Sequence, residues 1–176
     1  METKAKKKTP SSKEDAKAKA ETKKKDVADS KAGTKTSADV TAENKKSGKE
    51  FREIFIDGLK DILWAEKAFL KALPKMRKAA TGKELAASFE AHMSETENQI
   101  STLEKVFELM GEKPKTKKCD AMEGLISETE SIISDTEKGS AIRDAGLILA
   151  AQKVEHYEIA TYGTLAAFAD AMQEAN

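Results

Sequence analysis

Glu155-His156-Tyr157-Glu158-Ile159-Ala160-Thr161-Tyr162 is the stretch that decides the fold, because it places two carboxylates inside the longest apolar-periodic segment of the sequence. Counted at 3.6 residues per turn, the neighbouring apolar residues form one helical face, and Glu155 and Glu158 fall within it. The residues that define this face are Leu147, Ile148, Ala151, Ile159, Tyr162 and Leu165. A buried carboxylate without a partner costs several kcal/mol. The stretch therefore predicts a helix with two inward carboxylates that need a positive charge nearby.

The composition favours an all-α protein. Of the 176 residues, 39% are hydrophobic, 35% are charged and 5% are aromatic, and only 3 are prolines. Leu, Ala, Glu and Lys dominate the sequence, and these residues are good helix formers. The length suits one domain of ordinary size with an extension.

The single cysteine and the short apolar runs indicate a soluble protein. One cysteine cannot form an intrachain disulfide, so nothing points to an oxidising compartment. The lysines at the N-terminus are not followed by the apolar segment of a signal peptide, and no apolar run approaches the roughly 18 residues of a membrane span. We therefore expect a cytoplasmic protein that does not bind membranes.

The first 48 residues differ in charge from the rest of the chain. Residues 1–48 contain 14 Lys and 8 acidic residues, a net charge of +6, whereas residues 49–176 carry a net charge of −6. Residues 1–48 offer almost nothing apolar to bury, which predicts a disordered tail. Its lysines suit non-specific contact with nucleic-acid phosphates. A solubilising extension is the favoured alternative, because acids are interspersed and no aromatic residue can stack on bases.

Residues 49–176 are expected to form a four-helix bundle, and its first two helices each carry a polar residue at a core position. The first helix begins near Lys49 and has Glu66 inside its apolar stripe. Pro74 should kink or end this helix. A capping box at residues 81–84 begins the second helix. Its apolar face includes His92, and Glu95 lies on the next turn.

The third and fourth helices follow the same pattern. Residues 120–123 repeat the capping sequence, and Glu128 enters the apolar stripe of the short third helix, with Glu123 and Glu130 as flanking alternatives. Gly139 suits the left-handed residue after a helix, and Ser140 can cap the fourth helix, which contains the opening stretch. Four helices with inward faces predict a bundle.

Six residues with side chains that can bind metals thus occupy predicted core positions on four helices. They are Glu66, His92, Glu95, Glu128, Glu155 and Glu158. Like charges this close would raise one another's pKa unless a cation holds them ionised, and two divalent metals balance five carboxylates to within one charge. Carboxylate oxygens with one imidazole favour iron, or else manganese, over a thiolate-type zinc site. These metals exchange electrons with oxygen or peroxide, which suggests oxidation of Fe(II).

Five strings in the sequence closely resemble the YciE/YciF family of bacterial stress-associated ferritin-like proteins. They are Ala65-Glu66, Ala72-Leu73-Pro74, His92-Met93-Ser94-Glu95-Thr96, Cys119-Asp120-Ala121-Met122-Glu123-Gly124-Leu125-Ile126 and Gln152-Lys153-Val154-Glu155-His156-Tyr157-Glu158-Ile159-Ala160. The match covers roughly residues 50–172. The resemblance implies a ferritin-like bundle with a di-metal centre, a cytoplasmic location and a part in stress responses. The general ferritin-like pattern has Glu-x-x-His on two helices, whereas here the second helix reads His-x-x-Glu and the fourth Glu-x-x-Glu.

Several other interpretations remain open. A helical register shifted by one residue would leave the glutamates at the edge of their stripes in water. His92 could be a core histidine, Tyr162 could either pack in the core or donate a hydrogen bond near the metals, and His156 falls off the Glu155/Glu158 face. Cys119, just before a helix start, could have a lowered thiol pKa or be inert. The competing function is a non-enzymatic structural or binding module, and a homodimer is a further candidate.

Overall fold

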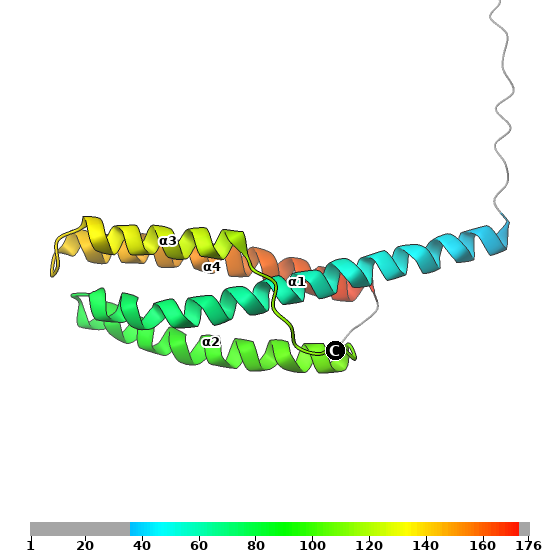
Figure 1. Cartoon of the computed structure of the whole chain (residues 1–176), viewed down its shortest axis with the longest axis horizontal. Helices are drawn as coiled ribbons and strands as arrows, with labels where there is room; N and C mark the ends of the chain where they lie inside the picture. Colours follow the sequence, from blue (N-terminus) through cyan, green and yellow to red (C-terminus); the bar gives the residue numbers. More distant parts are fainter. Residues whose placement is uncertain (1–35, 173–176) are drawn as a thin grey trace, which may run out of the picture. The chain divides into compact units, whose positions relative to one another are not determined.

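The computed structural model describes residues 36–172, and the side chains of residues 36 and 48–172 within them. These residues belong to one structural unit, which spans Lys35–Asn176. The described part of the chain contains four α-helices and no strand (Figure 1). They are α1 Ser37–Ala79, α2 Lys83–Leu109, α3 Asp120–Asp135 and α4 Ala141–Ala171. The predicted all-α, ferritin-like four-helix bundle is confirmed, whereas most of the predicted tail lies outside the described residues.

The bundle is built from two helical hairpins. α1 pairs with α2, α3 pairs with α4, and α1 also contacts α3 and α4. α2 makes its close backbone contacts mainly with α1. The connection from α2 to α3 crosses α1 (Figure 1), where the amide of Lys117 donates to the carbonyl of Lys60 at 3.0 Å. No helix among residues 36–172 is both long and apolar enough to cross a bilayer.

α1 is longer than its apolar stripe predicts at both ends. It begins at Ser37, well before the expected start near Lys49, and it continues through Pro74 to Ala79. Five of the twelve residues at positions 37–48 are good helix formers (Ala, Glu or Lys) and none is proline, so the helix can continue through this segment. Pro74 is exposed, while Leu73 and Met76 on the opposite face are almost fully buried. The core contacts of that face hold the helix together where proline removes one hydrogen bond.

The start of α2 corrects the predicted capping box at residues 81–84. Gly82 is the N-cap residue and forms no side-chain cap. Instead, the carboxylate of Asp144 on α4 accepts hydrogen bonds from the amides of Thr81 at 2.8 Å and Gly82 at 2.7 Å. These two bonds lower the pKa of Asp144, because they stabilise its charged form. A carboxylate distant in sequence thus fixes the residues just before the helix, and no side chain caps the first turn of α2.

The starts of α3 and α4 are capped by side chains. Cys119, rather than the predicted Asp120, caps α3, and its sulfur accepts from the amide of Met122 at 3.4 Å. The predicted cap of α4 is confirmed, since the Ser140 hydroxyl accepts from the amide of Arg143 at 3.2 Å. Gly139 has φ 84°, the left-handed conformation predicted for it.

The face that α4 presents to the core matches the predicted one only in part: Leu147 and Leu165 are buried, and Ala151 and Tyr162 pack against the core. Its buried apolar residues are Leu147, Ala150, Val154 and Leu165. Ile148 and Ile159, which were assigned to the inward face, are 48% and 67% exposed, so that part of the prediction was wrong. Apolar residues surround this helix, since Ile142 and Leu149 also lie on its exposed side. With so little polar surface, periodicity could not select one face.

Candidate metal centre

Three side chains from two helices meet between α2 and α4. His92 on α2 and Glu155 and Glu158 on α4 each offer one ligand-type atom, and these three atoms lie within 4.8 Å of one another. The Nδ1 atom of His92 is 3.3 Å from Oε1 of Glu155. Glu158 is buried, and Glu155 is partly open to solvent. Imidazole and carboxylate side chains at this spacing can share one metal ion.

Glu66 of α1 completes the group from a third helix. Its side chain is fully buried, and the hydroxyl of Tyr162 donates to its Oε1 at 2.8 Å. The charge of Glu66 acts on Glu158, and that of Glu155 acts on both. We call Glu66, His92, Glu155 and Glu158 the carboxylate–histidine cluster. The hydrogen bond confirms that Tyr162 acts as a donor at this place, one of the two roles considered for it.

Burial makes the two innermost carboxylates of the cluster hard to ionise. Loss of water raises the pKa of Glu66 to about 7, with the Tyr162 hydrogen bond opposing the rise and the charge of Glu155 adding to it. Loss of water also raises the pKa of Glu158 to about 8, and the charges of Glu66 and Glu155 add to the shift. Both groups therefore need either a proton or a cation near neutral pH.

The protein does not supply that cation from its buried basic residues. Arg143 is the only buried Lys or Arg among the described side chains. Its guanidinium donates to the carbonyls of Ile133, at 2.8 Å, and Thr136, and so caps the end of α3. Oε2 of Glu66 and Oε1 of Glu158 are buried without a hydrogen-bond partner. Two carboxylate oxygens are thus free to accept a bond from a ligand.

Glu95 and Glu128 do not face the core, so the predicted placement of both was wrong. Glu95 is exposed on α2, where the buried polar residues are His92 and Thr96. Glu128 is exposed on α3 and forms an ion pair with Lys153. The buried position of α3 is the next residue, Thr129. A shift of one residue turns a helical side chain by about 100°, which carries Glu128 into solvent.

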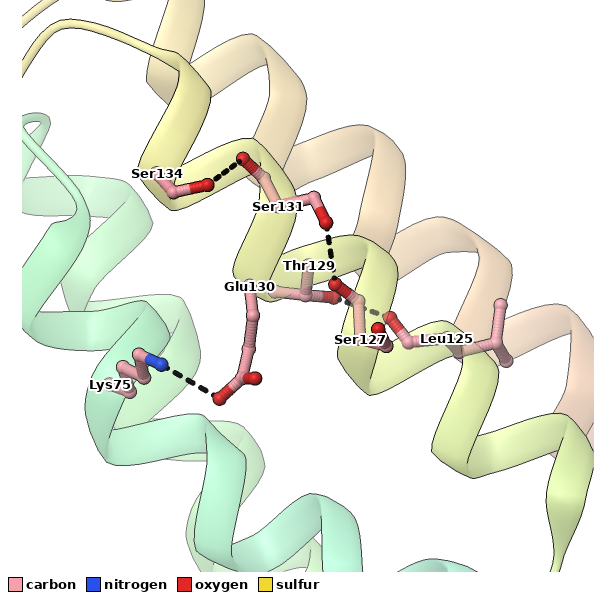
Figure 2. Close-up of polar contacts among 7 residues, drawn as sticks. All are labelled: Lys75, Leu125, Ser127, Thr129, Glu130, Ser131 and Ser134. Atoms are coloured by element: carbon pink, nitrogen blue, oxygen red, sulfur yellow. Dashed lines mark hydrogen bonds and ion pairs between the residues drawn. The ribbon is translucent and has the colours of Figure 1, made fainter.

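The flanking alternatives on α3 also point outward. Glu123 pairs with Lys118 at 2.6 Å, and Glu130 pairs with Lys75 of α1 at 2.7 Å (Figure 2). The buried hydroxyl of Thr129 donates to the carbonyl of Leu125 at 2.9 Å, within its own helix. α3 therefore contributes no carboxylate to the cluster, which draws on α1, α2 and α4.

His156 lies off the face of Glu155 and Glu158, as predicted. His156 is exposed, with Nδ1 at 2.7 Å from the carbonyl of Gln152. His92 contacts the ring of Phe69 edge to face, which suits its interpretation as a core histidine as well as a ligand. Burial raises the pKa of Cys119, so the thiol is not activated.

Sequence reasoning missed a second, partly buried polar group, which is centred on Tyr157. The hydroxyl of Tyr157 donates to Asp61 of α1 at 2.8 Å and lies 3.1 Å from the sulfur of Cys119. Its burial and these neighbours raise the pKa of Tyr157. Tyr157 adjoins Glu158 in the opening stretch, and Asp61 adjoins Ile62 in the stripe of α1. The positions of Tyr157 and Asp61 next to predicted core residues were the only indication of this contact in the sequence.

The fold and this cluster define a class of protein: a helical bundle with buried carboxylates and one imidazole gathered across three helices. The family model of the domain of unknown function DUF892 matches residues 50–176. The chain therefore belongs to this family, that of the YciE/YciF proteins, as the sequence strings predicted.

Three relatives show how closely the chain follows the family. Protein YciF of Escherichia coli strain K12 is 48% identical over 123 residues, which cover 69% of this chain and 74% of the relative. The crystal structure of the E. coli stress protein YciF matches with a TM-score of 0.66 at 47% identity, over 70% of this chain and 77% of that one. The structure of YcfI from Rhodopseudomonas palustris matches with a TM-score of 0.68 at 40% identity, over 70% and 78%.

Proposed function

We propose that the carboxylate–histidine cluster binds divalent iron or manganese and supports oxidation of Fe(II) by oxygen or peroxide as part of a stress response. The observation that carries the proposal is the meeting of His92, Glu155 and Glu158 within 4.8 Å. The buried acceptors of Glu66 and Glu158 without partners support it further. The naming of the E. coli relative as a stress protein is consistent with the physiological part.

Charge suggests how two ions would be shared. Three carboxylates offer a charge of −3 when ionised, so one divalent ion leaves the cluster anionic and two leave it slightly cationic. We propose that His92, Glu155 and Glu158 hold the first ion, and that Glu66 provides the carboxylate for a second, more weakly held one. Bound iron would supply the one-electron redox chemistry that the reaction needs. Either ion must displace protons from the carboxylates it binds.

The residues of the chain prepare this site in three ways. The Tyr162 hydroxyl fixes one oxygen of Glu66 and leaves the other free. Loss of water around Glu66 and Glu158 strengthens their attraction for a cation, because the surrounding dielectric is low. Glu155 is partly open to solvent, which leaves a route for an ion or a small oxidant to reach the cluster.

Metal content after aerobic reconstitution with Fe(II) tests the proposal, with the full chain as the sample and elemental analysis as the readout. We expect at least about one iron per chain in the wild type. Glu158→Gln should lose most of it, because the amide keeps the shape but removes the charge. Glu95→Gln and Glu128→Gln make the same change at exposed positions and should retain the metal. A wild type without iron or manganese, or equal losses in all three variants, contradicts the proposal.

The raised pKa values favour one second candidate, a structural protein whose cluster stays protonated. Glu66 and Glu158 with pKa values of about 7 and 8 can be neutral at neutral pH without any metal. The description of the R. palustris relative also proposes a structural role. In that case iron and manganese should leave the thermal unfolding midpoint of the full chain unchanged. A bound ion should instead raise the midpoint, since it binds only the folded state.

A further inference from the structure

Two further buried oxygens lie on α2, the helix that supplies His92 to the carboxylate–histidine cluster. Among the described side chains, four buried polar atoms have no hydrogen-bond partner. Two of them are the oxygens of Glu66 and Glu158 described above, and the other two are Oγ1 of Thr96 and Oε1 of Gln99. A buried oxygen without a partner destabilises the fold, because it loses its hydrogen bonds to water and gains none.

The contacts between α1 and α2 place Thr96 level with Glu66. The two helices form an antiparallel hairpin, as two ion pairs between them show, and the ring of Phe69 contacts that of His92. From this contact Glu66 lies three residues back along α1, and Thr96 lies four residues further along α2. Both steps run toward the same end of the bundle and amount to about one helical turn. Thr96 is 0% exposed, so its hydroxyl faces the interior there.

The contacts between α2 and α4 bring Glu158 to the same level. These helices run in the same direction, because Asp144 joins their first turns and Glu155 contacts His92 further along both. Glu158 follows Glu155 by three residues, and Thr96 follows His92 by four. The hydroxyl of Thr96 and two cluster carboxylates thus occupy one level of the bundle, each on a different helix.

Gln99 adds an amide oxygen from the next turn of α2. It follows Thr96 by three residues and therefore lies on the same side of the helix. The residue as a whole is partly exposed, but its Oε1 atom is buried, so this oxygen is turned away from solvent. Helical side chains also lean toward the preceding turn, which for Gln99 is the turn of Thr96. Oε1 of Gln99 is thus held on the inner side of α2.

The chemistry of these oxygens suits a hard divalent cation. Oε2 of Glu66, Oγ1 of Thr96 and Oε1 of Gln99 comprise one carboxylate, one hydroxyl and one amide carbonyl. Oxygen ligands of this kind suit manganese and magnesium better than the softer metals that thiolates select. A single carboxylate leaves a divalent ion with a net positive charge, which predicts weaker binding than at His92, Glu155 and Glu158.

We propose that Glu66, Thr96 and Gln99 form an all-oxygen subsite for the second, more weakly held divalent ion. The subsite rests on the proposed function, which gives this ion to Glu66, and it adds two neutral ligands from α2. Tyr162 holds Oε1 of Glu66 and so leaves Oε2 to the ion. A buried water on the same oxygens is the competing explanation, because such waters satisfy polar groups in protein interiors.

Manganese binding to the full chain tests the subsite, with electron paramagnetic resonance of the free ion as the readout. We expect two ions in the wild type, the second bound more weakly. Thr96→Val keeps the shape of the side chain and removes its hydroxyl, and Gln99→Leu removes the amide oxygen. Each should weaken the second ion at least about tenfold and leave the first unchanged. Thr129→Val is the matched control, since this buried hydroxyl already donates to the carbonyl of Leu125, and it should keep both ions.

The possible results separate this subsite from the function proposed above. A wild type that binds one ion, or variants that keep the second ion or lose both ions equally, overturns the subsite and leaves the proposed function in place. A wild type that binds no ion overturns both. Thr96→Ser restores the hydroxyl and should restore the second ion, which distinguishes a lost ligand from altered packing. Circular dichroism verifies folding, and Gln99→Leu decides the question if Thr96→Val does not fold.

A second measurement needs no metal. Because Oγ1 of Thr96 has no partner, Thr96→Val should maintain or raise the thermal unfolding midpoint of the full chain in EDTA. Thr129→Val breaks a hydrogen bond and should lower the midpoint. An equal fall in both variants would show that the Thr96 hydroxyl is already bonded in the metal-free protein. That result contradicts the unpartnered oxygen on which the subsite depends.

Discussion

Glu158 and Glu128 are the same side chain on paired helices, yet their surroundings are opposite. Glu158 is buried on α4 and has two other carboxylates near it. Glu128 is exposed on α3 and forms an ion pair with Lys153. The other glutamates of α3, at 123 and 130, also pair with lysines. The comparison teaches that the exposed glutamates of α3 are paired with lysines, whereas the buried Glu66 and Glu158 are left to a proton or an added cation.

The largest expected effect is on the stability of the metal-free protein as pH rises. In the unfolded chain Glu66 and Glu158 lose their protons near the ordinary pKa of 4.5, whereas in the folded protein they keep them until about 7 and 8. The unfolded state therefore binds fewer protons between these values, and the free energy of unfolding falls as pH rises from about 4.5 to 8. We expect a loss of several kcal/mol.

Urea unfolding of the full chain in EDTA at pH 5, 6.5 and 8 measures this loss. Stability that stays level or rises over this range would show that the cluster carboxylates are not desolvated as the structure has them. The same series with iron or manganese added should show a shallower fall, because a bound ion replaces the protons and binds more tightly as pH rises.

The next effect concerns Glu158 alone. Glu158→Gln keeps the shape of the side chain and cannot ionise, so it should stabilise the metal-free protein by about 2–4 kcal/mol at pH 8 and change little at pH 5. Paired urea titrations of variant and wild type at the two pH values check it. An equal effect at both pH values would indicate altered packing rather than removal of a charge.

A smaller effect is expected from the tyrosine that contacts Glu66. Tyr162→Phe removes the hydroxyl that donates to Oε1 of Glu66. It should lower the free energy of unfolding by about 1 kcal/mol at pH 7. It should also raise the pKa of Glu66 further, since this bond opposes the effect of burial. Tyr157→Phe, which removes a bond to Asp61, is the matched control. Both variants should lose stability, but only Tyr162→Phe should shift the dependence of stability on pH.

The smallest effect is expected at Glu128, the exposed glutamate of the comparison. Glu128→Gln breaks the ion pair with Lys153, and an exposed pair of this kind is worth at most about 1 kcal/mol. Urea unfolding at low and at high salt checks this value. A fall in the free energy of unfolding above 2 kcal/mol would mean that Glu128 makes a stabilising interaction that its exposed position does not explain.

The sequence predicted the parts of the cluster that lie on strongly amphipathic helices. Glu66 lies between Ile62 and Phe69 on α1, and His92 follows Phe89 on α2, so their burial could be inferred from periodicity. Glu158 was also placed correctly, although the apolar face assigned around it was partly wrong. The role of these residues as metal ligands stays a prediction.

The remaining placements depended on information that periodicity does not carry. Glu95 and Glu128 each lie next to a small buried threonine, Thr96 and Thr129, and the apolar pattern alone does not distinguish adjacent residues at the edge of a stripe. Lys153 pairs with Glu128 across two helices, and no local sequence rule gives such a partner. The hydrogen bond between Asp144 and Gly82 is likewise a tertiary contact.

The hydrogen bond between Asp144 and Gly82 also aligns the first turns of α2 and α4 along the axis of the bundle. Asp144 on the first turn of α4 holds the amide of Gly82 at the start of α2. His92 and Glu155 each lie about ten residues further along their helices, a rise of roughly 15 Å at 1.5 Å per residue. Two helices aligned at their first turns thus bring an imidazole and a carboxylate level with each other. The hydrogen bond at the end of the bundle therefore fixes the relative axial position of His92 and Glu155, although it contacts neither of them.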